Sequence, residues 1–254
     1  MRINYVVCFY ITDGAFRNTF RNNLYHHIDK FFAVKAHVEM INMLLIPTDI
    51  VKATFIVNRS DYIKDGDVEQ IIEDHNKKHH RPVTPHTIPI EVKYRDNWGR
   101  SYGAWEYHIR QSLHENYDFY FLTEDDYIPN IRYQDFYNVS AEDRSFYKPF
   151  LEKFTDNTAF VCGLWSANHP AISYGLYSAN ICKTMFDRYG EIFRGYNQKL
   201  AASKIFEYDE WQRSYHLNFF DSGFMMSDTT KNTSTVYCNH TYGINGSPPL
   251  LPLV

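Results

Sequence analysis

The sequence predicts an α/β fold in which helices flank a mostly parallel central sheet. Two observations predict this class. Runs rich in β-branched and aromatic residues recur along the first half of the chain, as buried strands require. Segments with apolar residues at helical spacing separate these runs, and such alternation is typical of a parallel sheet covered on both faces. With 254 residues the chain is long enough to bury a large core.

Each element of the first half follows from local pattern. The expected strands cover residues 3–12, 53–58, 87–95 and 117–122. Helical spacing relates Phe20, Leu24, Ile28, Phe31 and Phe32, whereas residues 36–47 fit a helix or a strand. Residues 65–80 and 101–117 are expected to be helical, with Asp67 as the N-cap of the first of these helices.

The pattern loosens in the second half, after about residue 130. Residues 158–165 and 233–243 fit strands, and residues 179–190 and 208–219 fit helices. We expect one domain over residues 1–246, and residues 247–254 fit a tail or a domain boundary.

Composition excludes several classes of function. The net charge of −4 gives no basic field for a nucleic-acid partner. No apolar run reaches the roughly 18 residues of a membrane span, and no cleavage site marks a signal peptide. Cys8, Cys162, Cys182 and Cys238 are far apart among apolar neighbours, so we expect free buried thiols and a cytoplasmic location.

Three adjacent carboxylates, Glu124, Asp125 and Asp126, directly follow the fourth expected strand. Ligands of parallel sheets bind at the carboxyl ends of strands. Clustered oxygen ligands suit a hard divalent cation, and Mg²⁺ commonly completes its shell with substrate phosphates. The triplet therefore fits a site for a metal ion and a diphosphate, although a solvated acidic turn is an equal alternative on charge alone.

Other candidate motifs have simpler explanations. Asp65 and Asp67 fit a turn followed by a helix cap. His75 and His79 are four residues apart on a helix, but Lys77 and Lys78 lie between them, so we interpret this stretch as a solvated polar face. The sequence lacks both glycine-rich phosphate-binding patterns, GxxxxGK[ST] and GxGxxG. It also lacks the GxSxG pattern of a nucleophile-elbow serine.

Residues 96–129 resemble the core signature of GT-A fold glycosyltransferases. Asn97 and Gly99 match its turn, Gly103 and Ala104 open its helix, and the acidic triplet matches the D-x-D-type motif that ends the next strand. The resemblance implies a GT-A-like Rossmann-type sandwich. It also implies a nucleotide-sugar donor, UDP-sugar or alternatively GDP- or dTDP-sugar, bound in residues 1–130 through Mn²⁺ or Mg²⁺. A glycan or glycoconjugate acceptor would bind in residues 131–246.

The resemblance also implies residue roles. Asp126 is the favoured direct metal ligand, and His240 a further ligand. Glu124, a second candidate ligand, and Asp125 would contact ribose or metal-bound water. Asp209 or Glu210 would be the catalytic base of an inverting enzyme. Gly175 would lie in an acceptor-side glycine loop. The residues expected to line the nucleotide or contact its phosphates are Tyr10, Thr12, Asp61, Arg95, Asn97 and Arg100.

Aromatic residues are abundant, and four of them are candidate faces for sugar rings: Trp165, Tyr174, Tyr177 and Trp211. Two alternatives stand beside a transferase. A sugar-nucleotide nucleotidyltransferase shares a related fold, but the segment after the first strand is poor in glycine for its phosphate loop. A catalytically inactive carbohydrate- or nucleotide-binding domain of the same fold would not need the acidic residues.

Overall fold

A computed structural model describes residues 1–12, 15–17, 25–27, 29–44, 48–79, 87–125, 127–129, 146–163, 165–166, 169–170, 174–193, 225–228 and 234–236. The strands are β1 (Ile3–Tyr10), β2 (Ala15–Arg17), β3 (Tyr25–His27), β4 (Ile50–Asn58), β5 (Ile90–Arg95), β6 (Phe119–Glu124), β7 (Tyr127–Pro129), β8 (Thr158–Cys162), β9 (Trp165–Ser166), β10 (His169–Pro170), β11 (Tyr174–Ser178), β12 (Met225–Asp228) and β13 (Ser234–Val236). The helices are α1 (Phe32–Met43), α2 (Asp67–Lys78), α3 (Arg100–Ser112), α4 (Lys148–Leu151) and α5 (Ala179–Tyr189), with a short 3-10 turn, η1 (Leu113–Glu115).

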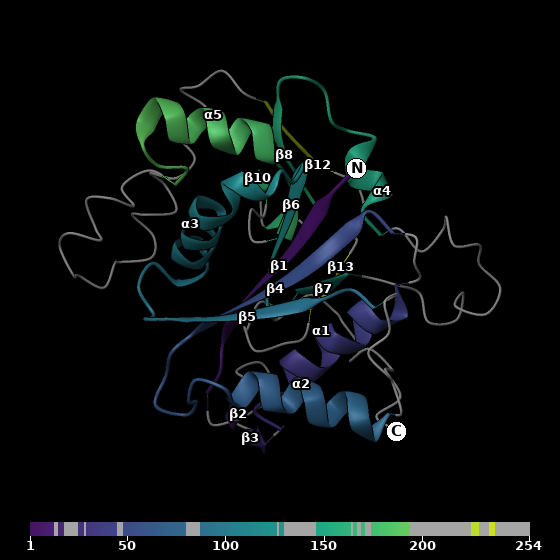
Figure 1. The fold of residues 1–254 in the computed structure, drawn as a ribbon, viewed down its shortest axis with the longest axis vertical. Coiled ribbons are helices and arrows are strands. Elements are labelled where there is room, and N and C mark those ends of the chain that lie inside the picture. Colours follow the sequence, from purple (N-terminus) through teal and green to yellow (C-terminus); the bar gives the residue numbers. More distant parts are fainter. Residues whose placement is uncertain are drawn as a thin grey trace.

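A seven-stranded sheet in the order β12-β8-β11-β6-β1-β4-β5 forms the centre of the molecule (Figure 1). The pairs β1–β4, β4–β5, β1–β6 and β12–β8 are parallel. Strand β11 alone runs antiparallel to both of its neighbours in this sheet, β6 and β8. The predicted mostly parallel sheet is therefore confirmed.

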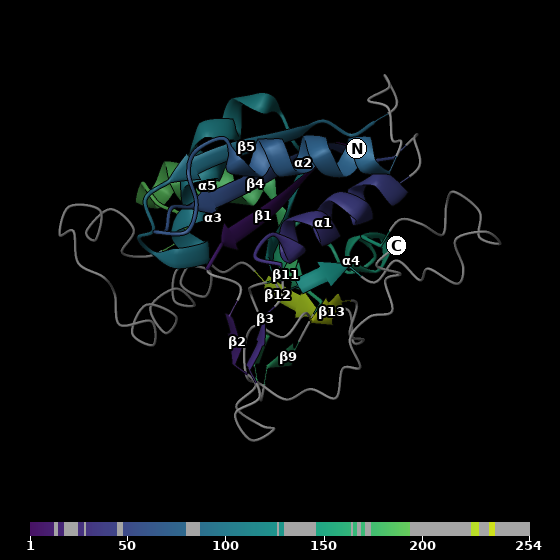
Figure 2. The same cartoon turned by 90° about the horizontal axis from the view of Figure 1, so that it is seen from below.

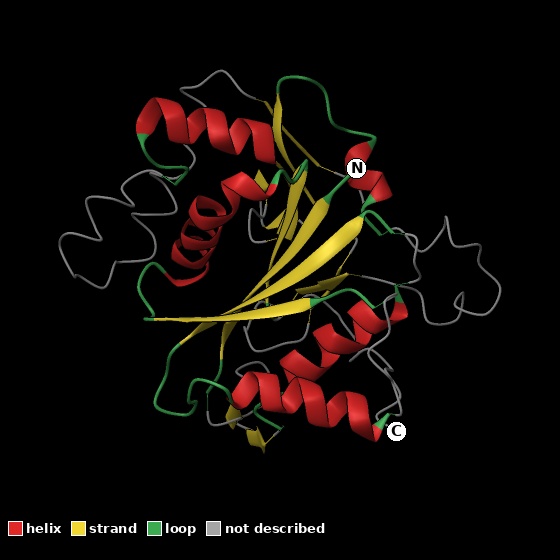
Figure 3. Cartoon of the chain, in the orientation of Figure 1, coloured by secondary structure: helices red, strands yellow, loops and turns green. Residues whose placement is uncertain are grey.

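Helices cover both faces of the sheet. Figure 3 shows α1 and α2 on one face and α3 and α5 on the other. Strand β1 is buried on both faces of the sheet. Tyr5 and Val7 belong to the apolar cluster on the side of α1 and α2, and Val6 and Cys8 belong to the cluster on the side of α3 and α5. This two-sided burial explains why the run contains almost only apolar residues.

Short pairs of strands accompany the main sheet. Strand β2 pairs with β3, β9 with β10, and β7 with β13, each antiparallel. In Figure 2 the β2–β3 hairpin lies beyond the end of β1. The pairing of β7 with β13 ties the segment after the acidic pair to a distant part of the chain.

Two predictions of local structure were wrong. The helical spacing through Leu24 and Ile28 does not produce a helix at Tyr25–His27, which form β3, and α1 begins only at Phe32. Asp67 is the first residue of α2 rather than its N-cap; Gly66, with φ 100°, holds the cap position. The Asp67 carboxylate instead accepts a hydrogen bond from the Lys64 backbone N–H at 3.0 Å.

The ambiguous segment 36–47 is helical as far as Met43, the last residue of α1. Cys8, Cys162 and Cys182 are buried thiols outside any disulfide, as expected, while Cys238 lies outside the described residues. Across the described part of the chain, every helix is too short or too polar to cross a lipid bilayer.

Candidate functional site

The strand order reverses between β1 and β6. The chain builds outward from β1 through β4 to β5, and then returns to the opposite side of β1 with β6. In open α/β sheets, ligands bind outside the carboxyl ends of the strands where the order reverses in this way. The residues that follow β1 and β6 are therefore the first candidates for a site.

Two acidic side chains lie at this point. Glu124 is the last residue of β6 and lies opposite Cys8 of β1, and Asp125 follows in the turn. Both side chains are half-buried. The structure thus confirms that the acidic residues lie at the carboxyl end of a central parallel strand.

The backbone after β1 orients Asp125. The Tyr10 N–H donates to Oδ2 of Asp125 at 3.1 Å, so the end of β1 is joined to the acidic turn. The Tyr10 side chain itself is 49% exposed. Thr12, two residues on, is half-buried.

The N-terminus of α3 orients Glu124. The Ser101 hydroxyl donates to Oε1 of Glu124. Gly99 and Arg100 precede Ser101 and have positive φ values of 66° and 48°. This conformation turns the chain sharply into the helix. The amino end of a helix carries partial positive charge, so α3 presents a favourable environment for an anion beside Glu124.

Glu124 has a strongly perturbed pKa. Burial, the largest influence, and the negative charge of Asp125 raise its pKa to about 7, against the lowering effects of the Ser101 hydrogen bond and of Arg100. Two carboxylates at the mouth of a sheet therefore repel each other and are poorly solvated. A divalent cation would relieve both penalties, and two carboxylates are donors that Mg²⁺ and Mn²⁺ accept. The residues present fit such an ion.

A buried histidine that sequence reasoning missed supports the acidic turn. Nε2 of His37, on α1, lies 3.2 Å from the carbonyl oxygen of Asp125, and Nδ1 lies 2.8 Å from the Tyr5 hydroxyl. A carbonyl can only accept, so Nε2 carries the proton and Nδ1 accepts from Tyr5. Burial lowers the pKa of His37 to about 3, so the ring is neutral. A lone histidine in an apolar helix gives no sequence signal of this role.

Arg95 is buried and binds the protein's own backbone. Its guanidinium donates to the Asn58 side chain at 2.7 Å and to the Trp98 carbonyl at 2.6 Å. Asn58 in turn donates to the Cys8 sulfur at 3.3 Å, which links the carboxyl ends of β5, β4 and β1. These contacts give Arg95 a structural task at the edge of the candidate site.

Gly103 allows the loop before α3 to pack closely. A Cβ atom at this position would lie 2.4 Å from the Trp98 carbonyl oxygen and 3.2 Å from the Arg95 guanidinium. Because the first of these contacts is with backbone, a larger residue would displace the loop that leads to Arg100 and Ser101. Close packing against the Trp98 carbonyl therefore explains the glycine at position 103 of the signature-like stretch.

The remaining nucleotide-binding candidates lie on loops at the same edge. Asn97 is exposed between β5 and α3, and Arg100 is exposed as the first residue of α3. Asp61 is exposed after β4, in a loop that the Ser60 hydroxyl joins to the Ile11 carbonyl at 2.5 Å. Their contacts with a nucleotide stay a prediction.

Two acceptor-side predictions were wrong. Residues 174–178 form strand β11 rather than a glycine loop, and a Cβ at Gly175 would lie 2.4 Å from the Val161 carbonyl oxygen of β8. Gly175 therefore allows close strand packing. Tyr174 and Tyr177 are fully buried in the two cores, so neither ring offers a face to a sugar.

Several candidate residues fall outside the described residues. They are Asp126, Asp209, Glu210, Trp211 and His240. The side chain of Trp165, in β9, is likewise not described. Their expected roles stay predictions.

Comparisons with known proteins give a weak structural likeness only. No protein-family model matches the chain, and no curated protein matches its sequence. The fold is similar to a crystal structure of S. aureus TarS, with 10% identity and a TM-score of 0.38 over 73% of this chain and 30% of that one. A structure of S. aureus TarS 1–349 gives 9% identity and a TM-score of 0.44 over 93% of this chain and 60% of that one. The chain thus spans less than two thirds of either.

Proposed function

We propose that the protein is a metal-dependent glycosyltransferase. It moves a sugar from a nucleotide-sugar donor, with UDP-sugar favoured and GDP- or dTDP-sugar as alternatives, to a hydroxyl of a glycan or glycoconjugate acceptor. The observation that carries the proposal is the half-buried pair Glu124–Asp125 at the reversal point of the sheet, beside the amino end of α3. The signature-like stretch 96–129 supports the same function.

The donor diphosphate would bind between the acidic pair and α3. Glu124 and Asp126, with His240 as a further candidate, would hold Mn²⁺ or Mg²⁺, and Asp125 would contact ribose or metal-bound water. A bound divalent cation supplies positive charge next to the leaving diphosphate. Arg100 is exposed at the start of α3, where its guanidinium can reach a phosphate. Tyr10 ends β1 and Asp61 lies on the loop after β4, and both side chains can line the nucleoside.

Transfer itself needs a base. In the favoured inverting reaction, Asp209 or Glu210 removes the proton from the acceptor hydroxyl as its oxygen bonds to the anomeric carbon. The bond from that carbon to the diphosphate breaks, and the nucleoside diphosphate leaves.

A thermal-shift screen tests this function. We expect one class of UDP-, GDP- or dTDP-sugar to raise the melting temperature with Mn²⁺ or Mg²⁺ present and not in EDTA. At about 100 times Kd, the rise should be about 5 to 10 °C. If no nucleotide sugar changes the melting temperature with either metal, the proposal fails. Stabilisation by a nucleoside triphosphate with a sugar 1-phosphate would instead favour a nucleotidyltransferase.

A further inference from the structure

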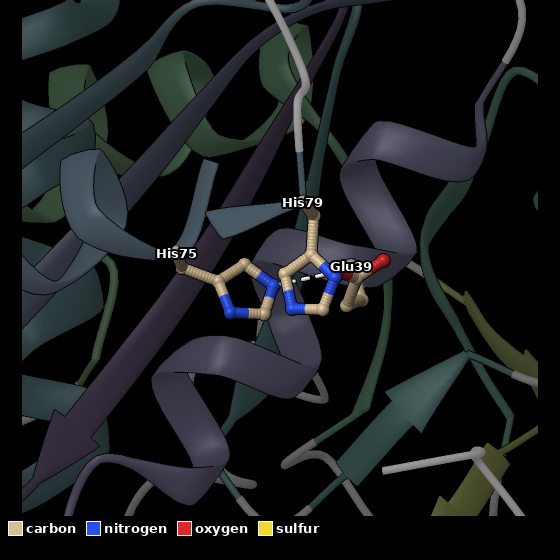
Figure 4. Close-up of side chains that lie close together, drawn as sticks. All are labelled: Glu39, His75 and His79. Atoms are coloured by element: carbon tan, nitrogen blue, oxygen red, sulfur yellow. Dashed lines mark hydrogen bonds and ion pairs between the residues drawn. The ribbon is translucent and has the colours of Figure 1, made fainter. Parts of the chain in front are cut away.

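A second group of metal-ligating side chains lies between α1 and α2. Figure 4 shows His75 of α2 and His79, the C-cap residue that follows α2, pointing toward Glu39 of α1. One ligand atom from each residue lies within 4.8 Å of the other two. Nε2 of His75 is 2.6 Å from Oε1 of Glu39, and the two imidazole rings are 4.5 Å apart between centroids.

Burial separates this group from an ordinary polar surface. The side chains of His75 and Glu39 are only 9% and 22% exposed, whereas Lys77 and Lys78 are exposed. The interpretation of this stretch as a solvated polar face was therefore wrong for the histidines. Residues four apart share one face of a helix, and here that face packs on α1.

The neighbouring contacts hold the two helices in place. The Asn42 side chain of α1 donates to Oδ1 of Asn76 on α2 at 2.9 Å, beside the Glu39–His75 contact. Glu39 and His75 thus lie on regular helices, and His79 is the C-cap of α2, where its backbone N–H donates to the His75 carbonyl at 3.1 Å. Rigid elements of this kind suit a metal site because the ligands are already close before the ion binds.

We propose that Glu39, His75 and His79 bind one divalent transition-metal ion of the Zn²⁺ type, which crosslinks α1 and α2. Two imidazoles and one carboxylate are a common donor set for Zn²⁺, with a fourth position left to water or another ligand. Bonds of about 2.0–2.1 Å place tetrahedral ligand atoms about 3.3 Å apart, so small side-chain rotations from the observed spacing are enough. The ion takes the place of the hydrogen bond between Nε2 of His75 and Oε1 of Glu39, and Nδ1 of His75 then carries the proton of the neutral ring.

The donor set distinguishes this site from the acidic pair. Imidazole nitrogen favours Zn²⁺, Co²⁺ and Ni²⁺, whereas a pair of carboxylates suits Mg²⁺ and Mn²⁺. The inference does not depend on the glycosyltransferase proposal. The competing explanation is a metal-free hydrogen bond that only joins the two helices.

Metal titration of the whole chain tests the proposal. Protein stripped with EDTA is titrated with Co²⁺, followed by visible absorption, and with Zn²⁺, followed by calorimetry, both in excess Mg²⁺ to fill oxygen-only sites. We expect His79→Gln and Glu39→Gln each to lose one equivalent of bound Zn²⁺, or to bind it more than about tenfold more weakly. The control His114→Gln alters an exposed histidine on η1 and should bind as the wild type does.

The melting temperature gives a second measure of metal binding, which the wild type and the control still provide if a variant folds poorly. Zn²⁺ at about 100 times Kd should raise the melting temperature of the wild type and of His114→Gln by about 5 to 10 °C. His79→Gln should show a smaller rise. Equal stoichiometry and equal shifts in all four proteins would overturn the site and leave the metal-free helix contact as the explanation.

Discussion

Glu124 shows how a single residue can serve a site at a cost in stability. Its carboxylate is half-buried beside Asp125, and burial raises its pKa to about 7. An isosteric amide would remove the charge while its oxygen could still accept the Ser101 hydrogen bond. A carboxylate at this position therefore supports the cationic ligand that we propose.

The substitution Glu124→Gln should change how stability depends on pH. The folded-state pKa of about 7 exceeds the ordinary value of 4.5, so the native state binds more protons between these values. The wild type should therefore lose stability as pH rises from about 5 to 8. The variant should lose about 1–3 kcal/mol less over that range, measured by urea unfolding at both pH values without metal. Parallel pH profiles for the two proteins would contradict the assignment.

His37 acts on the site through the Asp125 carbonyl. His37→Phe keeps a ring of similar shape but removes the donor to Asp125 and the acceptor for Tyr5. We expect a loss of about 1–3 kcal/mol in the free energy of unfolding, together with weaker metal-dependent nucleotide binding. His37→Gln keeps one donor and one acceptor, so it should recover part of both losses. Equal behaviour of the two variants would argue that His37 only fills space.

At the scale of elements, α3 joins the candidate site to the apolar cluster on the α3 and α5 side of the sheet. Glu106, fully buried on α3, accepts hydrogen bonds from the backbone N–H groups of Ile192 and Phe193 at 2.9 and 3.0 Å, and from Arg110 at 2.8 Å. Burial raises the pKa of Glu106 to about 7 although these donors oppose the rise. One carboxylate thus fastens the segment after α5 to α3.

Glu106→Ala should destabilise the protein far more than a surface substitution does. It leaves the buried N–H groups of Ile192 and Phe193, and the partly exposed Arg110 side chain, without this acceptor, and we expect a loss of about 3–5 kcal/mol. Glu152→Ala, at an exposed site after α4, serves as the control and should change stability by less than about 0.5 kcal/mol. Chemical denaturation measures both, and a loss below about 1 kcal/mol for Glu106→Ala would contradict this role.

Local patterns predicted the central strands well because burial on both faces leaves a strong apolar signal. The patterns failed where distant contacts decide. Tyr25–His27 pair with β2 as a strand although the spacing through Leu24 is helical. The sequence around Gly175 does not distinguish a loop glycine from one that allows the Val161 carbonyl to pack closely.

The candidate site was predictable only where residues are adjacent in sequence. Glu124 and Asp125 directly follow a strand, so their position could be inferred. His37 could not, since it lies 88 residues from Asp125 and reaches it through helix packing. His75 and His79 were visible as a pair, but Glu39 becomes their neighbour only when α1 packs on α2.

For the whole molecule, the acidic pair and the histidine cluster differ both in their position in the fold and in their chemistry. The acidic pair lies where the strand order reverses, between β1 and β6, and both side chains are partly exposed. The cluster of Glu39, His75 and His79 lies between two helices that cover one face (Figures 1 and 4). An ion at the cluster would hold helices together, whereas an ion at the acidic pair would hold a substrate.

Calorimetric titration with UDP, GDP and dTDP, in Mn²⁺ and in EDTA, tests the central claim most directly. It compares the wild type, Asp125→Asn and the control Asp187→Asn, which alters an exposed carboxylate on α5. We predict that one nucleotide binds the wild type and the control only with Mn²⁺, and binds Asp125→Asn at least about tenfold more weakly, a difference of about 1.4 kcal/mol. Nucleotide binding that is equally tight in EDTA, or unchanged in Asp125→Asn, would contradict a metal–diphosphate site at the end of β6.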